Sequence, residues 1–195
     1  MKNKKTLYII IIIVLLISIS IFGYLIYSRN NSKFKTEYEK FNNRQGYINV
    51  NINNNNKINY INIDFIENVI KNKDSMMLFI GSPQNNFSRN IAETIVNVTN
   101  ETDIDAVYYI KSDGLDYEKI SDVLGDVFTE DKLNDGAVIF IVDGVVVSYN
   151  FKTVASHKDA MIKMDDDQLK GLKNIYINGI DFILESKKIN GSYEN

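Results

Sequence analysis

The sequence predicts an α/β domain behind an N-terminal transmembrane helix. An uncharged apolar run over 7–27 is long enough, as a helix, to cross the hydrocarbon core of a bilayer. From residue 58 onward, short apolar runs alternate with segments whose apolar residues recur every three or four positions. That alternation is typical of strands followed by helices, and it predicts a central sheet flanked by helices.

The charges around the apolar run favour a signal anchor. Three lysines lie in the tail 1–6, and four basic residues lie between 28 and 40, so the positive-inside comparison is nearly balanced. A basic tail followed by one apolar run favours a cytoplasmic N-terminus and an extracytoplasmic domain in the cell membrane. A cleaved secretion signal is the alternative, but its apolar stretch is shorter and ends in a small-x-small cleavage site.

Residues 28–57 read as a polar stalk and spacer. Phe34, Tyr38 and Phe41 recur at helical spacing in an otherwise polar stretch, which predicts a short stalk helix. The asparagine-rich stretch Asn51–Asn56 is low in complexity and is typical of a turn or spacer.

The first half of the domain follows as strand, helix, strand, loop and helix. Apolar residues from Ile58 onward predict the first strand, and Asp64 with Glu67 has the spacing of a capping box. The run Met76–Ile80 predicts a buried strand, which breaks at Gly-Ser-Pro. A second helix is expected over about Asn86 to Asn97.

The second half adds two elements before a hairpin and a terminal helix. A strand is expected over Asp105 to Ile110, and a helix over Tyr117 to Val127. Two apolar runs flank Asp143-Gly144, which is a strong hairpin signal. An amphipathic helix begins after Asp165 and contains Gly179, which costs about 1 kcal/mol relative to alanine.

Composition excludes several classes of function. The chain has 195 residues, a formal net charge of −3 and no cysteine. The near-neutral charge gives no electrostatic footprint for nucleic acid. Without cysteine the chain carries no dithiol oxidoreductase chemistry and no cysteine-ligated zinc or iron–sulfur site. His157, the single histidine, is expected in a surface loop, and we expect no metal and no cofactor.

The segment Met76 to Ile91 resembles the active-site segment of the thioredoxin superfamily. It is most similar to the small bacterial thioredoxin-like proteins known as bacteriocin transport accessory or thiol-disulfide proteins, in which a strand and Gly-x-Pro-x precede Cys-x-x-Cys. Gly81 and Pro83 match this pattern, and the cysteine positions fall on Asn85 and Ser88. The order of elements extends the resemblance over roughly 58–185. It implies a thioredoxin-like domain over 58–187, followed by a polar tail over 188–195.

Further departures from the family pattern agree with the loss of the cysteines. Redox thioredoxins carry a cis-proline just before the fourth strand, where the hairpin register places Gly136. Many also bury an acid in the second strand, at the register of Phe79. The resemblance therefore implies a lineage that has abandoned the redox reaction.

The family's active-site position remains the candidate site, as a groove that binds peptide. Its expected residues are Ser82, Pro83, Asn85, Asn86, Phe87, Ser88 and Gly136. Free N–H groups at a helix start favour extended peptides or anionic groups, but Asn and Ser are also common helix caps with no further role.

The expected function is that of a membrane-anchored, redox-inactive accessory protein of the bacterial cell envelope. The resemblance implies assistance in the export, maturation or immunity of a secreted peptide, with a protein or peptide partner. The alternatives are a structural subunit of a secretion or conjugation assembly and an indirect helper of thiol-disulfide exchange.

Overall fold

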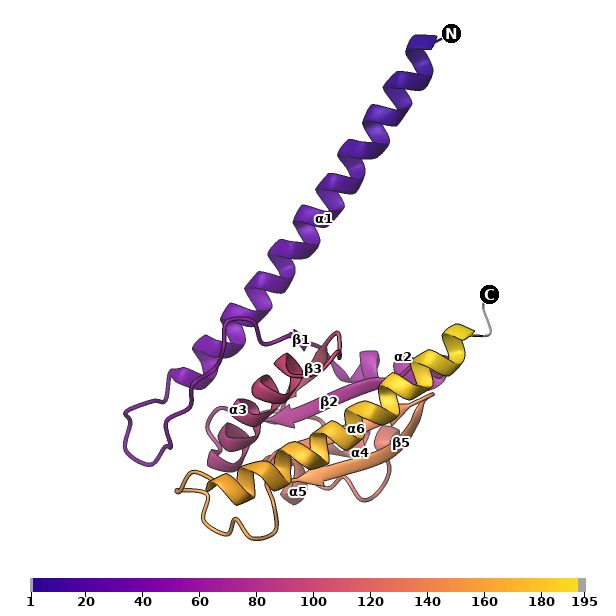
Figure 1. Cartoon of the computed structure of the whole chain (residues 1–195). Coiled ribbons are helices and arrows are strands. Elements are labelled where there is room, and N and C mark those ends of the chain that lie inside the picture. Colours follow the sequence, from indigo (N-terminus) through magenta and orange to yellow (C-terminus); the bar gives the residue numbers. More distant parts are fainter. Residues whose placement is uncertain (1, 193–195) are drawn as a thin grey trace.

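A mixed five-stranded sheet with helices packed on it forms the body of the protein, and a long N-terminal helix projects from it (Figure 1). The structure, a computed structural model, describes residues 2–192. The expected tails 1–6 and 188–195 therefore lie partly outside the described residues. In chain order the elements are α1 (Lys2–Glu39), β1 (Ile58–Tyr60), α2 (Ile63–Asn72), β2 (Met76–Gly81), α3 (Asn86–Asn100), β3 (Val107–Lys111), α4 (Tyr117–Leu124), α5 (Glu130–Asn134), β4 (Ala137–Val142), β5 (Val145–Phe151) and α6 (Asp166–Ser192).

The strands lie in the order β1-β3-β2-β4-β5. The first three are parallel, whereas β4 runs antiparallel to β2 and β5 antiparallel to β4. Every residue of the central strand β2 is buried, as expected for a strand covered on both faces. The predicted α/β class, with a central mixed sheet flanked by helices, is confirmed.

The hairpin predicted at Asp143-Gly144 is also confirmed. The φ angles of these two residues are 50° and 77°, and both are positive, as a two-residue type I′ turn requires. The turn joins β4 to β5, so β5 becomes the last strand of the sheet.

The N-terminal helix has an apolar part and a packed part. By length and composition it is apolar enough to cross a membrane. Its most apolar stretch has a mean hydropathy of 3.1, and none of that stretch is buried against the domain. Further along, Phe34 and Tyr38 are completely buried in the core between the sheet, α3 and α6.

The expectation that 28–57 is a spacer is therefore wrong. Besides Phe34 and Tyr38, the same core contains Ile48, Val50 and Ile52 from the chain that follows α1. These three apolar residues alternate with asparagines, and the alternation places them on one side of an extended chain. The packed body of the protein thus begins well before residue 58.

Aromatic rings fill the space between α1 and the sheet. The ring centroids of Phe34 and Tyr38 are 4.5 Å apart, and the ring of Tyr109 lies 5.1 Å from Phe34 and 5.2 Å from Phe79. The Tyr109 hydroxyl donates to the carbonyl of Gly81 at 2.9 Å. Phe79 is thus part of an apolar contact that fixes α1 on β2.

Several helix ends differ from those expected from the sequence, because other side chains cap the helices or because a helix ends earlier. Asn62, and not Asp64, caps α2 by accepting from the N–H of Phe65 at 3.1 Å, while Asp64 pairs with Lys119. The helix expected over 117–127 ends at Leu124, and the short α5 follows it. The capping box that does form joins Asp165 and Gln168, each side chain accepting the other's backbone N–H.

Gly179 allows α6 to lie close against β4. A Cβ at this position would stand 2.5 Å from ring atoms of Phe140, whereas a Cβ at Gly171 would meet only Val154, at 3.4 Å. The helix-propensity cost of Gly179 is therefore offset by close packing on the sheet.

Replacing these two glycines should give opposite results. We expect Gly179→Ala to lower the free energy of unfolding by about 1–3 kcal/mol, because the added methyl overpacks the contact with Phe140. The matched change Gly171→Ala should leave it unchanged or raise it by up to about 1 kcal/mol through helix propensity. Urea unfolding of the full chain in detergent micelles measures both, and equal effects would contradict the packing role.

Buried tyrosines should make stability fall at alkaline pH. Burial raises the pKa of Tyr176, and the nearby Asn150 side chain opposes this rise only in part. Among the described residues the Tyr176 hydroxyl makes no hydrogen bond of good geometry. Its phenol stays protonated in the folded chain but ionises near pH 10 in the unfolded one. Unfolding therefore releases a proton above that pH, and the free energy of unfolding falls as pH rises through and beyond 10.

The variant Tyr176→Phe isolates this contribution. It should change stability by less than about 1 kcal/mol near pH 8, since no hydrogen bond is lost. Above pH 10 it should reduce the alkaline slope by up to about 1.4 kcal/mol per pH unit. Urea unfolding between pH 8 and 11 is the measurement, and an unchanged slope would show that Tyr176 ionises in the folded state.

Candidate functional site

The junction between β2 and α3 has the predicted arrangement of strand, loop and helix. Strand β2 ends at Gly81, the loop passes through Pro83, and α3 begins at Asn86. Asn85 is the N-cap, and its side-chain oxygen accepts the N–H of Ser88 at 3.1 Å. Asn85 and Ser88, the two residues that the resemblance aligned with cysteines, are thus joined in a helix cap.

Internal hydrogen bonds engage the polar side chains of this junction. The Ser88 hydroxyl is completely buried and accepts the N–H of Ser82 at 3.2 Å. The Ser82 hydroxyl donates to Asp113 at 2.8 Å, and the Asn85 amide donates to Asp135 at 3.1 Å. These contacts hold the loop in place and keep the Ser88 hydroxyl from solvent.

Gly136 closes the remaining space in front of the helix. Its φ is +100°, and a Cβ would stand 2.7 Å from the Ser88 hydroxyl and 3.0 Å from a methyl of Ile91. Glycine is required here for the backbone conformation and for this close approach. The chain entering β4 therefore packs directly on α3.

The expectation of an exposed groove at this junction is wrong. Only Asn85 and Phe87 of the seven candidate residues are partly exposed, whereas Ser82, Pro83, Asn86, Ser88 and Gly136 are buried. The structure does bring all seven residues together at one end of the sheet. Their role in binding a peptide stays a prediction, and that role would need the rim formed by Asn85 and Phe87.

The chain after α1 covers one side of the junction. We call residues 42–52 the strap. The Asn86 side chain accepts from the N–H of Ile48 at 3.0 Å and donates to the carbonyl of Gly46 at 2.9 Å. Asn86, expected as a groove residue, is therefore a bridge between α3 and the strap.

Arg89 forms the second and stronger connection to the strap. Its side chain is completely buried and donates to the carbonyls of Tyr38, Ile48 and Pro83. It also donates to the side-chain oxygen of Asn42 at 2.7 Å. Burial lowers the pKa of the Arg89 guanidinium, and carbonyl and amide oxygens receive its N–H groups in place of a carboxylate.

A conservative change at Arg89 should release the strap. Lysine lacks the planar fork, so Arg89→Lys leaves buried carbonyls without donors and should cost about 2–4 kcal/mol of stability. Hydrogen–deuterium exchange of 42–52 should then become faster. The matched change at the exposed Arg44, Arg44→Lys, should cost less than about 0.5 kcal/mol and leave that exchange unchanged. Unchanged exchange in Arg89→Lys would contradict the anchoring role.

His157 is buried, so the expectation of a surface residue is wrong. Its Nε2 lies 2.8 Å from the carbonyl of Ile162, and its Nδ1 lies 2.7 Å from the hydroxyl of Thr153. A carbonyl only accepts, so Nε2 carries the proton and Nδ1 accepts from the threonine. The ring also stands edge-on to Phe87, with the centroids 5.7 Å apart. His157 therefore packs against Phe87, one of the two partly exposed residues of the junction.

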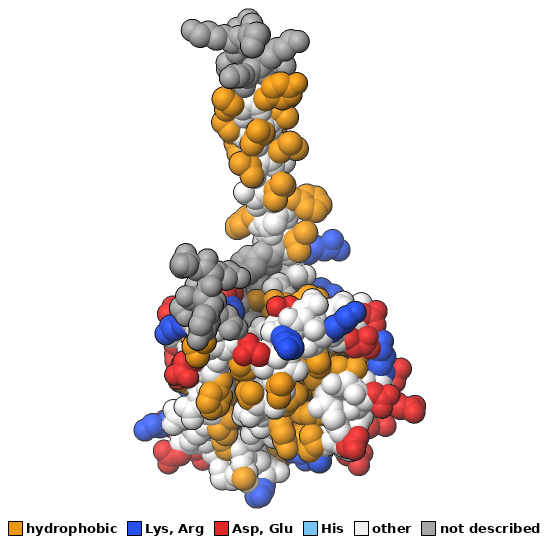
Figure 2. Space-filling model, turned by 90° about the vertical axis from the view of Figure 1, so that its right-hand side faces the viewer, with side chains coloured by type: hydrophobic (Ala, Val, Ile, Leu, Met, Phe, Trp, Pro, Cys, Tyr) orange, Lys and Arg blue, Asp and Glu red, His pale blue; other side chains and the backbone are white. Residues whose placement is uncertain are grey.

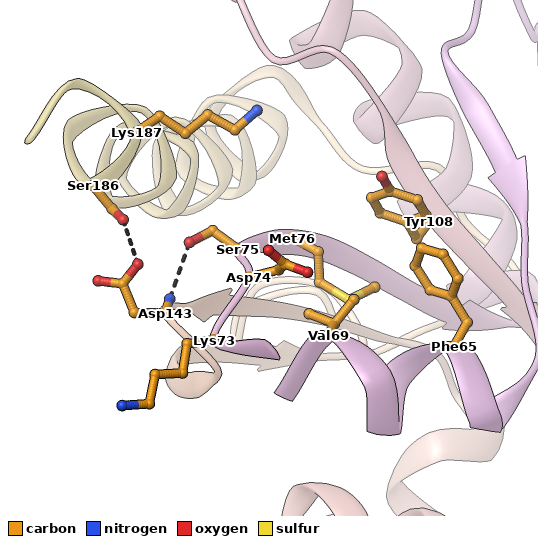
Figure 3. A pocket seen from close by; sticks show the side chains of 10 residues that line it. All are labelled: Phe65, Val69, Lys73, Asp74, Ser75, Met76, Tyr108, Asp143, Ser186 and Lys187. Carbon is orange, nitrogen blue, oxygen red and sulfur yellow. Dashed lines mark hydrogen bonds between the residues drawn. The ribbon is translucent and has the colours of Figure 1, made fainter. Parts of the chain in front are cut away.

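A hollow of about 400 Å³ lies at the opposite end of β2 (Figure 3). One wall is apolar, with the rings of Phe65 and Tyr108 lying together in Figure 3. The other wall is polar: Asp143 accepts from the Ser186 hydroxyl at 2.8 Å, and its backbone N–H donates to Ser75 at 3.0 Å. Sequence analysis missed this hollow, because its residues come from a helix end, a turn and the last helix.

The polar side chains of the junction are engaged in internal contacts. Among residues 2–192 no group of three or more His, Asp or Glu side chains could hold a metal ion. Ser88 is buried, and His157 already bonds to Thr153 and Ile162. What these residues do is hold a loop, a strap and a helix start together.

Comparisons with protein-family models and with curated proteins give no match for this chain. The thioredoxin resemblance therefore depends on the chain's own residues and on the arrangement of its elements.

Proposed function

We propose that this protein is a membrane-anchored, redox-inactive, thioredoxin-like binding protein that acts as an accessory at the bacterial cell envelope. Its partner is a protein or peptide, and its work is to assist the export, maturation or immunity of a secreted peptide. The observation that carries the proposal is the helix start of α3. There Asn85 and Ser88 occupy the positions of the family's cysteines and are committed to a cap.

The sheet supports the thioredoxin-like part of the proposal. A βαβαβ half, formed by β1, α2, β2, α3 and β3, precedes an antiparallel hairpin and a closing helix. This is the order that the resemblance implies. Gly136, which the resemblance aligns with the cis-proline, packs against Ser88, which the resemblance aligns with a cysteine.

The geometry of α1 supports a domain held at the membrane surface. The apolar run over 7–27 ends seven residues before Phe34, which corresponds to about 10 Å along a helix. Phe34 is already part of the core. In the proposed topology the N-terminus is cytoplasmic, and the domain lies directly outside the bilayer.

A structural subunit of a membrane assembly is the second candidate. The free edge of the sheet at β5 favours it, because such an edge can join another chain by strand pairing.

Site-specific photo-crosslinking in native membranes tests the proposed function. Probes at Asn85 and at Val147, on β5, sample the two faces, and a probe at Gln168 is the control. Either candidate should give a discrete adduct from Asn85 or Val147 and none from Gln168. Mass spectrometry of the adduct separates a secreted peptide, which a binding protein holds, from a resident membrane subunit, which an assembly contains. Equal adducts from all three positions, or none from any, would contradict a binding role.

A further inference from the structure

We infer that the free edge of β5 is a strand-addition site for an extended, uncharged polypeptide segment of another chain. The inference deepens the proposed function and rests on it, because it assigns the partner to one surface of the domain. Strand addition supplies affinity through backbone hydrogen bonds and specificity through alternate side chains.

The backbone of β5 has one row of hydrogen-bonding groups turned away from the sheet. The N–H of Lys152 donates to the carbonyl of Gly136 at 2.8 Å, which fixes the phase of the antiparallel ladder. Ser148 and Asn150 then face β4, and the backbone groups of Tyr149 and Phe151 point outward. The register is unbroken over Ser148–Phe151, and the irregularity of the ladder lies before it.

The side chains along this edge are apolar and exposed. Val145 is 63% exposed, Val147 46% and Tyr149 44%. Hydrophobic side chains also lie between charged ones on the face of the domain that Figure 2 shows. Edge strands are commonly protected by lysine or proline, yet 144–151 contains no charged residue and no proline.

The ends of the edge indicate the charge of the occupant. Asp143 stands at one end, and Lys152, paired with Asp135 at 2.6 Å, stands at the other. A segment of about four to six residues can pair between these charges if its own centre is neutral. Alternate side chains of the segment would then lie beside Tyr149 and Phe151, and Val147, the extra residue at the irregularity of the ladder, would lie at the end of the paired stretch.

A second copy of this chain fits the edge poorly when both copies share a membrane. Antiparallel pairing of two β5 strands in one continuous sheet places the two-fold axis along the sheet normal. Figure 1 looks onto the sheet across α6, and α1 runs along the plane of that view. The two-fold axis would therefore turn the two α1 helices in opposite directions, and both could not enter the same bilayer.

Peptide binding to the purified full chain in detergent micelles tests the inference. The probe is a fluorescein-labelled decapeptide of alternating valine and threonine. We expect saturable binding, with amide exchange at Tyr149 and Phe151 slowed about tenfold or more, because these N–H groups gain partners. Exchange at Ser148 and Asn150, which already face β4, should stay unchanged.

Three variants separate strand addition from general hydrophobic adhesion. Val147→Lys should weaken peptide binding about tenfold, because it places a charge on the edge. Val147→Thr keeps the β-branched shape and should stay within about threefold. Ile162→Lys makes the same change at an exposed apolar residue outside β5 and should have no effect.

Absent binding, protection outside β5, or full binding in Val147→Lys would each overturn the inference. Self-association of the wild-type chain that Val147→Lys abolishes would overturn it in favour of a second copy. A crosslink from Asn85 in membranes, without peptide protection of β5 in micelles, would refute the edge site and leave the proposed function standing.

Discussion

The buried guanidinium of Arg89 is the interaction on which the rest of the structure depends. Its N–H groups reach α1, the strap and the loop after β2 at once, through the carbonyls of Tyr38, Ile48 and Pro83. A buried cation without a carboxylate is tolerated only when oxygen dipoles surround it. These three segments must therefore be in place together, and α1 is bound to α3, the helix that begins at the candidate site.

The same packing explains why the junction between β2 and α3 is closed. A reactive thioredoxin-type centre needs a thiolate within reach of a substrate, and such a centre must leave space in front of its helix. Here Ser88 and Gly136 pack against each other, and Asn86 and Arg89 face the strap. Exposed apolar side chains also lie at the far edge of the sheet, on β5.

Features governed by local chemistry could be predicted from the sequence. The Asp143-Gly144 turn and the buried strand β2 could be predicted because both depend on residues that are adjacent in the sequence. The roles of Arg89 and His157 were not, since the oxygens they contact come from segments far away in the chain. The strap was missed because asparagines separate its apolar residues. The candidate residues were brought together as predicted, but their burial depends on the strap and on Gly136.

The continuity of α1 with the packed core has a consequence for how partners are met. A domain on a flexible tether samples a hemisphere, and its effective concentration near a partner follows the length of the linker. Here Phe34 and Tyr38 lie on the same uninterrupted helix as the apolar run, so a helix and not a flexible linker joins that run to the domain. In a bilayer, β5 would stay at one height and one tilt. Encounters would become a two-dimensional search by lateral diffusion, with rotation only about the membrane normal.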